Sequence, residues 1–172
     1  MEPASLRLCR SLLFLPAANA RAIDKARELD ADMVVLDLED SVKEEDKGAA
    51  RDAAVAAVAL GFGGRPVAIR VNATSSTHYG ADVVAVRRSA ADHVVLAKTE
   101  TPKQAAEAAW LMGKPVLAMI ETPRGVIDAA AIAPATRGLI AAATGGAERH
   151  DGRMIETLHV EQARGLLAKA RR

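Results

Sequence analysis

This sequence has only one cysteine, and its basic and acidic residues are nearly equal in number. The single cysteine, Cys9, excludes an intramolecular disulfide. Lysine and arginine total 23 against 22 aspartate and glutamate residues, a formal net charge of +1, which excludes a strongly basic surface for nucleic acid. No apolar run approaches the roughly 18 residues of a membrane span, and the N-terminus lacks the order of a signal peptide. We therefore expect a cytoplasmic protein that acts on small molecules, without a nucleic-acid or membrane partner.

Aromatic residues are also few, which limits how the core is built. The chain has one tryptophan, one tyrosine and two phenylalanines, although 50% of its residues are hydrophobic. The core must consist of Val, Leu, Ile and Ala, which is typical of parallel strands beneath helices. With 172 residues, the chain can form one domain with a sizeable core. It is shorter than the usual complete eight-fold barrel of about 250 residues.

Short apolar runs alternate with amphipathic stretches along the chain. Five runs have the length and Val, Leu or Ile content of buried strands: residues 10–16, 33–40, 66–72, 93–98 and 115–122. Four stretches between them have helical spacing: residues 19–29, 43–60, 80–88 and 101–112. The expected helix caps are Asn19, Ser41 and Thr101 at the starts and Gly61 and Gly113 at the ends. This alternation predicts a parallel sheet covered by helices, which both a barrel and an open doubly wound sheet satisfy.

Charged and polar residues close four successive predicted strands. They are Asp37, Glu39 and Asp40; Arg70 and Asn72; Lys98 and Glu100; and Glu121, Thr122 and Arg124. Barrel enzymes take their catalytic groups from these strand ends, and burying such groups is costly unless they meet one another, a metal or a ligand. The alternative is that each residue is a solvated loop start or a helix cap. The repetition at four strands favours a site.

The available side chains restrict the chemistry of that site. The glycine-rich residues 61–64 end a helix and precede a strand, the reverse of a nucleotide-binding loop. The histidines His78, His93, His150 and His159 are scattered, which argues against zinc. Carboxylates instead suit Mg²⁺, with Glu121 as the first ligand candidate.

Several segments resemble the HpcH/HpaI aldolase and citrate lyase beta-subunit family in order and spacing. They are RSLLFLPAANARAIDKA, DMVVLDLEDSVKEEDKGAAR, VAIRVN, VVLAKTE and AMIETPRGVIDAAAIA, within residues 8–142. The resemblance implies an α/β fold of the TIM (β/α)8 barrel type that is incomplete, with about six β-α units plus a C-terminal helix. Residues 1–143 would form the partial barrel, and residues 144–172 a hairpin-like stretch and helix of the same family.

The resemblance also implies a Mg²⁺-dependent carbon–carbon lyase that cleaves an acyl-CoA thioester such as citryl-, malyl- or citramalyl-CoA. Glu121 would bind the metal, and Arg70 would hold the substrate carboxylate or the developing oxyanion. Glu39, Asp40 and Lys47 would shape the metal's outer shell, while Arg10 and Lys98 would line the rim near CoA. The resemblance implies a homo-oligomer for members of the family, and it leaves the oligomeric state of this chain open.

The chain departs from the family pattern after a sixth predicted strand, residues 138–143. The Gly-x-x-Asp-Leu segment that carries the family's second metal ligand does not follow. We interpret this as an internal deletion near residues 143–145, which leaves strand edges unpaired and weakens metal binding, so we expect little turnover. Two functions stay open: an acyl-CoA lyase, and a non-catalytic protein that binds CoA or full-length homologues. An open-sheet domain for another ligand is a third. His159, on the closing helix, is interpreted as a packing residue.

Overall fold

The computed structural model describes residue 9 and residues 11–141. Six strands form one parallel sheet: β1 (Leu12–Pro16), β2 (Met33–Asp37), β3 (Val67–Val71), β4 (His93–Leu96), β5 (Val116–Ile120) and β6 (Gly138–Ala141). Five α-helices follow the first five strands: α1 (Ala20–Ala26), α2 (Lys47–Leu60), α3 (Tyr79–Arg88), α4 (Pro102–Met112) and α5 (Pro123–Ile132). Two 3₁₀ turns, η2 (Glu44–Asp46) and η3 (Ala133–Ala135), complete the described elements.

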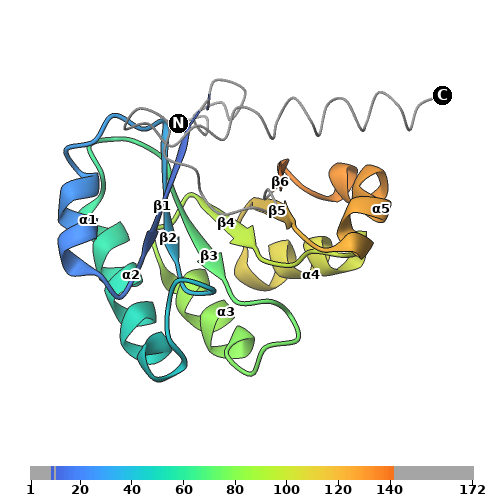
Figure 1. Cartoon of the computed structure of the whole chain (residues 1–172), viewed down its shortest axis with the longest axis horizontal. Helices are drawn as coiled ribbons and strands as arrows, with labels where there is room; N and C mark the ends of the chain where they lie inside the picture. Colours follow the sequence, from blue (N-terminus) through green and yellow to red (C-terminus); the bar gives the residue numbers. More distant parts are fainter. Residues whose placement is uncertain (1–8, 10, 142–172) are drawn as a thin grey trace.

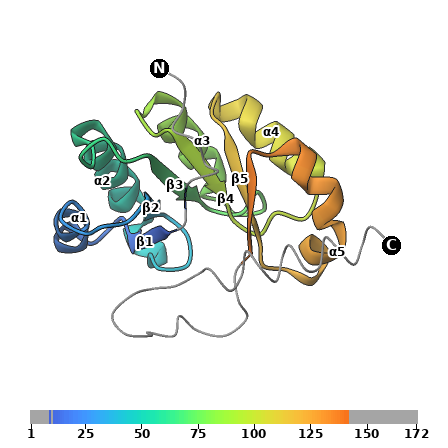
Figure 2. The same ribbon diagram turned by 90° about the horizontal axis from the view of Figure 1, so that it is seen from above.

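The strand order distinguishes between the two architectures that the sequence left open. The strands lie in chain order from β1 to β6, and each neighbouring pair is parallel (Figure 1). Figure 2 shows that they curve into an arc with the helices along its outer side. A doubly wound sheet would reverse its order and carry helices on both faces. The fold is therefore an incomplete barrel, as predicted.

The two faces of the sheet bury different residues because successive side chains of a strand point to opposite sides. One face packs against the helices, with Val34 and Leu36 beside residues such as Ala50 and Ala54 of α2. The concave face carries a separate apolar cluster, built from Met33, Val35, Ala68, Val95, Leu117 and Met119. The same alternation of side chains places Asp37 and Arg70 on the concave side, directly above this cluster. The fold therefore places the carboxylate of Asp37 and the guanidinium of Arg70 at the mouth of the partial barrel.

The helix boundaries test the predicted caps. The Asn19 side chain accepts a hydrogen bond from the amide of Ala22, and Thr101 forms a capping box with Gln104. Gly61 and Gly113 end their helices with φ of 74° and 63°. Ser41 was wrongly predicted as a cap: its hydroxyl and amide bond to Asp37, and α2 begins only after the η2 turn.

One helix is not among the four stretches predicted from helical spacing, although the six or so β-α units implied by the family resemblance include it. Residues Pro123–Ile132 form α5, which begins at Thr122, whose hydroxyl accepts a hydrogen bond from the amide of Gly125. The proline at its first position suits a helix start.

Several predictions fall on residues that the structure does not describe. They concern Arg10, the division at residue 143, the deletion near residues 143–145, and the closing helix with His159. Within the described residues, no helix has the length and apolar character needed to cross a lipid bilayer.

Gly125 lets the start of α5 approach the loop after β4. A Cβ atom at this position would lie 2.5 Å from the carbonyl oxygen of Thr99, so Gly125→Ala should lower the free energy of unfolding by about 1–3 kcal/mol through overpacking. Gly48, in the first turn of α2, has open space around its Cβ position. Gly48→Ala should therefore raise stability by about 0.5–1 kcal/mol. Urea denaturation of both variants measures the contrast, and equal effects would contradict the close approach.

Candidate functional site

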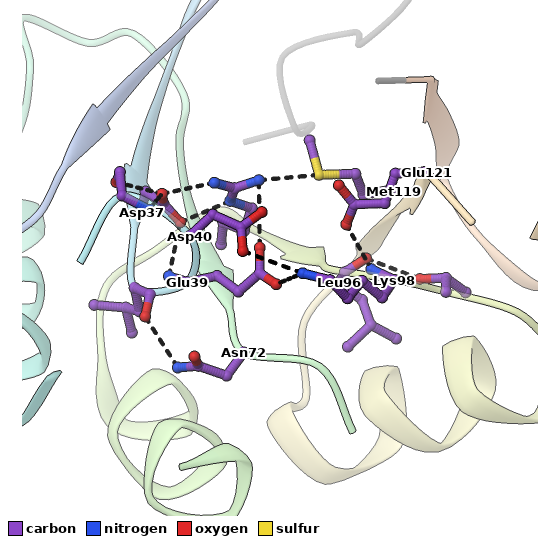
Figure 3. Close-up of polar contacts among 12 residues, drawn as sticks. Asp37, Glu39, Asp40, Asn72, Leu96, Lys98, Met119 and Glu121 are labelled. Carbon is purple, nitrogen blue, oxygen red and sulfur yellow. Dashed lines mark hydrogen bonds and ion pairs between the residues drawn. The ribbon is translucent and has the colours of Figure 1, made fainter. Parts of the chain in front are cut away.

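The carboxyl ends of β2, β3, β4 and β5 gather one set of charged side chains at the mouth of the partial barrel (Figure 3). Parallel pairing places Asp37 of β2 beside Arg70 of β3. Glu39 and Asp40 lie in the loop after β2, Lys98 follows β4, and Glu121 follows β5. Of the residues to which the family resemblance gives a role, the structure brings together Glu39, Asp40, Arg70, Lys98 and Glu121. Lys47 lies behind the loop of Glu39 with its ammonium on backbone carbonyls, and Arg10 lies outside the described residues.

Arg70 is the central cation of this set. Its Nε and Nη2 donate to the two carboxylate oxygens of Asp37, each at 2.6 Å. Its Nη1 lies 3.5 Å from Glu39 Oε2 and 3.3 Å from the sulfur of Met119, and the guanidinium lies over the ring of Phe14. The Nη1 edge of the guanidinium is thus the part of Arg70 that can reach a ligand.

The Asp37–Arg70 pair is buried, and its charges stabilise each other. Burial alone would raise the pKa of Asp37, but the hydrogen bonds and positive charge of Arg70 outweigh it and hold that pKa below its ordinary value. Burial would likewise lower the pKa of Arg70, yet Asp37 raises it. Asp37 therefore stays ionised, and it fixes the plane of the guanidinium.

Glu39 is a buried carboxylate with an incomplete set of partners. It is 6% exposed, and its Oε1 accepts a hydrogen bond from Lys98 Nζ. Its Oε2 is buried without a hydrogen-bond partner. Burial raises the pKa of Glu39 against the lowering influence of Lys98 and Arg70. A buried carboxylate oxygen without a donor is costly. Glu39 Oε2 is therefore suited to bind a cation or to accept a hydrogen bond from a ligand.

Lys47 and Asn72 hold the backbone that presents Glu39. The ammonium of Lys47 donates to the carbonyl oxygens of Leu38 and Glu39, both at 2.9 Å. Asn72 Nδ2 donates to the Leu38 carbonyl at 3.0 Å. Lys47 is buried and lies behind the loop instead of beside the carboxylates. Its contact with the site therefore runs through the backbone of the loop.

Lys98 connects three carboxylates through two of its own groups. Its Nζ bonds to Glu39 and lies 3.2 Å from Asp40 Oδ1, and its backbone amide donates to Glu121 Oε1 at 2.8 Å. Its φ of 50° makes it the one non-glycine residue of the described chain with positive φ. A left-handed conformation costs roughly 1–2 kcal/mol for such a residue, and here it accompanies the amide contact with Glu121. The predicted contact of Lys98 with CoA stays a prediction.

Sequence reasoning missed a second buried network behind the site. Asp82 of α3 is fully buried and accepts hydrogen bonds from Arg51 Nε at 2.8 Å, Asn72 N at 2.9 Å and Asn72 Nδ2 at 2.7 Å. The sequence indicates only weakly that Asp82 is buried. It stands one helical turn before Val86, on the side of α3 that faces the core.

Other strand-end residues have the ordinary roles that the sequence left open. Thr122 caps α5, and Arg124 pairs with Asp128 on the same helix at 2.5 Å. The Arg124 side chain is 65% exposed. His93 lies at the start of β4, so it stands at the opposite end of the sheet from the charged set. These residues are not part of the site.

The carboxylates of the described residues could supply only part of a metal ion's ligands. Across residues 9 and 11–141, no three His, Cys, Asp or Glu side chains converge as a metal-binding group. Mg²⁺ in enzymes commonly uses only one or two protein carboxylates and completes its shell with water and substrate. Glu121 and Glu39, whose Oε2 lacks a hydrogen-bond partner, fit that smaller donor set.

Comparison with known proteins gives a consistent set of similarities. The model of the HpcH/HpaI aldolase/citrate lyase family matches residues 10–149. A (3S)-malyl-CoA thioesterase of Cereibacter sphaeroides (strain KD131) is 34% identical over 135 residues, which cover 76% of this chain and 47% of that protein. Citrate lyase subunit beta of Escherichia coli (strain K12) is 34% identical over 158 residues, which cover 84% of this chain and 52% of that protein. The chain thus spans about half the length of these curated relatives.

Solved structures show the same likeness. The citrate lyase beta subunit of Mycobacterium tuberculosis, complexed with oxaloacetate and magnesium, superposes with a TM-score of 0.71 and 29% identity, over 95% of this chain and 74% of that one. The protein CitE from the same organism, in complex with magnesium, acetoacetate and coenzyme A, gives a TM-score of 0.69 and 31% identity, over 96% of this chain and 64% of that one.

Proposed function

The chain belongs to the HpcH/HpaI aldolase/citrate lyase family, and from this premise we propose that its strand-end site serves a Mg²⁺-dependent carbon–carbon lyase. The substrate would be a 3-hydroxyacyl-CoA that carries a carboxylate, such as citryl-, malyl- or citramalyl-CoA. The products would be an acyl-CoA and a keto acid. The observation that carries the proposal is Glu39 Oε2, a buried carboxylate oxygen without a donor that lies 3.5 Å from the guanidinium of Arg70.

Each residue of the site has a role in this reaction that its contacts support. In this cleavage the substrate hydroxyl loses its proton to a base and becomes the carbonyl of the keto acid as the carbon–carbon bond breaks. The bonding electron pair stays on the acyl-CoA fragment as an enolate, which takes up a proton to give the acyl-CoA. Arg70, held by Asp37, would donate from its Nη1 edge to the substrate carboxylate or the developing oxyanion, because charge-assisted hydrogen bonds to oxyanions are strong. Lys47 and Asn72 would keep the Glu39 loop in place while this happens.

Glu121 and Glu39 would hold the metal, with Asp40 beside them. Bound Mg²⁺ supplies Lewis-acid polarisation of the keto-acid carbonyl. Glu121 is prearranged for this by the Lys98 amide, which holds its Oε1. The charged set contains four carboxylates (Asp37, Glu39, Asp40 and Glu121) and two cationic groups (Arg70 and Lys98), so its formal charge is −4 + 2 = −2. A divalent cation would offset this charge, which favours the approach of an anionic substrate.

The test is the thermal stability of the purified chain with Mg²⁺ and oxaloacetate or an acyl-CoA, followed by an assay for acyl-CoA release from malyl- and citramalyl-CoA. Ligands stabilise the state that binds them, by about 2.7 kcal/mol at one hundred times Kd. We expect Glu121→Gln to remove the Mg²⁺-dependent part of that stabilisation and any turnover. Glu107→Gln, an exposed position on α4, is the matched control and should retain both. Equal behaviour of the two variants would contradict the assignment of Glu121.

A second candidate function, binding without catalysis, has its own supporting observation. Within residues 9 and 11–141, β1 pairs only with β2 and β6 only with β5, so these residues provide no strand partner for the outer edges of β1 and β6. We propose as the alternative that the chain is non-catalytic and either binds CoA or joins a full-length homologue, for which these two edges would be the contact. Native mass spectrometry with such a homologue distinguishes the two candidates, since a stable complex without turnover favours the second. A cytoplasmic location stays a prediction, and the oligomeric state of this chain stays open.

A further inference from the structure

We propose that Lys98 is an internal counter-ion of the Glu39–Asp40 carboxylate pair, which a divalent cation must displace in order to bind. The inference deepens the proposed function and rests on it, because it concerns the same site. It assigns Lys98 a role in setting metal affinity, whereas the family resemblance suggested only a position near CoA.

The contacts of Lys98 are those of a bridging cation. Its side chain crosses from the end of β4 to the loop after β2, and its Nζ contacts Glu39 Oε1 and Asp40 Oδ1 (Figure 3). Its backbone amide holds the third carboxylate, Glu121, at 2.8 Å. One residue thus contacts the three carboxylates that are proposed above to surround the metal, Glu39, Asp40 and Glu121. Its left-handed backbone, with φ of 50°, is the conformation in which it makes these contacts together.

Because Glu39 is buried, a cation that binds to it is expected to displace the ammonium of Lys98. Glu39 is 6% exposed and offers two oxygens, of which Oε1 is taken by Lys98 and Oε2 has no hydrogen-bond partner. A cation bound to Glu39 would therefore stand within a few ångströms of the ammonium, where like charges repel strongly. The Lys98 side chain is 41% exposed, so water can solvate the ammonium once it leaves.

Arg70 and Lys47 are poor candidates for the same role. Arg70 is fixed by two hydrogen bonds to Asp37, and Lys47 is buried with its ammonium on two backbone carbonyls. Moving either group would leave buried partners without their donor. Lys98 is the cation of the set that can move at least cost.

The first experiment measures Mn²⁺ affinity of the full chain by electron paramagnetic resonance. We expect Lys98→Met to bind Mn²⁺ about tenfold more tightly than the wild type, since a nearby positive charge is removed. Lys103→Met, which makes the same change at an exposed position on α4, should leave the affinity unchanged. Unchanged or weaker binding by Lys98→Met, in a protein that melts like the wild type, overturns the proposal.

A second measurement detects the displacement itself. Acetylation of lysines by N-hydroxysuccinimide acetate, mapped by mass spectrometry, should rise at Lys98 several-fold when Mg²⁺ is added, while labelling of Lys103 stays constant. Labelling of Lys98 that is constant or reduced with Mg²⁺ overturns the proposal.

The outcomes separate this proposal from the proposed function. If the wild type binds Mn²⁺ and Glu121→Gln does not, but Lys98→Met matches the wild type, then the metal site stands and the counter-ion role fails. If only Lys98→Met binds Mn²⁺, the counter-ion role is supported, and the metal-dependent function of the natural chain is the part that fails. No binding by any of the three proteins overturns both.

Discussion

Arg70→Met is expected to lower the free energy of unfolding by about 3–5 kcal/mol, the usual cost of removing one partner from a buried ion pair. The Asp37 carboxylate is 1% exposed and would lose two hydrogen bonds and its counter-charge. Glu39, buried nearby, would lose the guanidinium that lies 3.5 Å from its Oε2. Because a domain of this size has a total stability of about 5–15 kcal/mol, the variant should unfold at a markedly lower urea concentration.

Two further variants test whether the loss comes from the buried pair. Adding Asp37→Asn to Arg70→Met should restore part of the stability, since the amide is neutral and its single oxygen can still accept from one of the two backbone amides, of Glu39 or of Ser41, that bond to separate oxygens of the carboxylate. Arg124→Met removes the exposed Arg124–Asp128 pair and should cost about 0.5 kcal/mol or less. A loss in Arg70→Met no larger than in Arg124→Met would contradict the assignment.

The pH dependence of stability offers an independent measure of the same pair. The folded pKa of Asp37 is held below its ordinary value, so its contribution is fully present above the unfolded pKa of about 3.9. That contribution is lost as the pH falls from there towards the lower folded pKa. Below about pH 4, the wild type should therefore lose stability more steeply than Arg70→Met does.

Asp82→Ala should have the second largest effect, a loss of about 3–4 kcal/mol. Asp82 is fully buried and is the only hydrogen-bond acceptor that the described residues provide for the Arg51 side chain; Arg51 Nη2 is already without a partner. The substitution would also leave the amide of Asn72 without its acceptor. Asp52→Ala, at an exposed position on α2, should change stability by less than about 0.5 kcal/mol.

The same substitution should also weaken the site, because Asn72 connects the two networks. Its Nδ2 bonds both Asp82 and the carbonyl of Leu38, next to Glu39. We therefore expect Mn²⁺ affinity to fall in Asp82→Ala even under conditions where the protein stays folded. Combining Arg51→Met with Asp82→Ala should recover stability, since no buried charge is then left alone, but it should not recover metal affinity. Full recovery of both would show that Asn72 does not transmit the effect.

Some features of the protein follow from local sequence. Strand and helix alternation is visible because buried parallel strands are continuous apolar runs and helices repeat every 3 to 4 residues. Asn19, Thr101, Gly61 and Gly113 were predicted correctly because capping depends on a residue and its near neighbours. The predicted cap at Ser41 was wrong because the hydroxyl of Ser41 bonds instead to Asp37, at the end of β2.

The order of residues along the chain is enough to place charged residues at the carboxyl ends of neighbouring strands, since a polar residue that ends an apolar run must lie at the edge of the sheet. Which of these charges pair depends on the three-dimensional arrangement of the strands. Arg70 meets Asp37, 33 positions away, and Lys98 meets Glu39, 59 positions away. Such pairs depend on strand register, on the curvature of the sheet and on which face each side chain takes, and these are set by the packing of the whole barrel fragment. For the same reason Asp82, a single acid on a helix, became recognisable as a buried anchor only when α2, α3 and β3 were placed together.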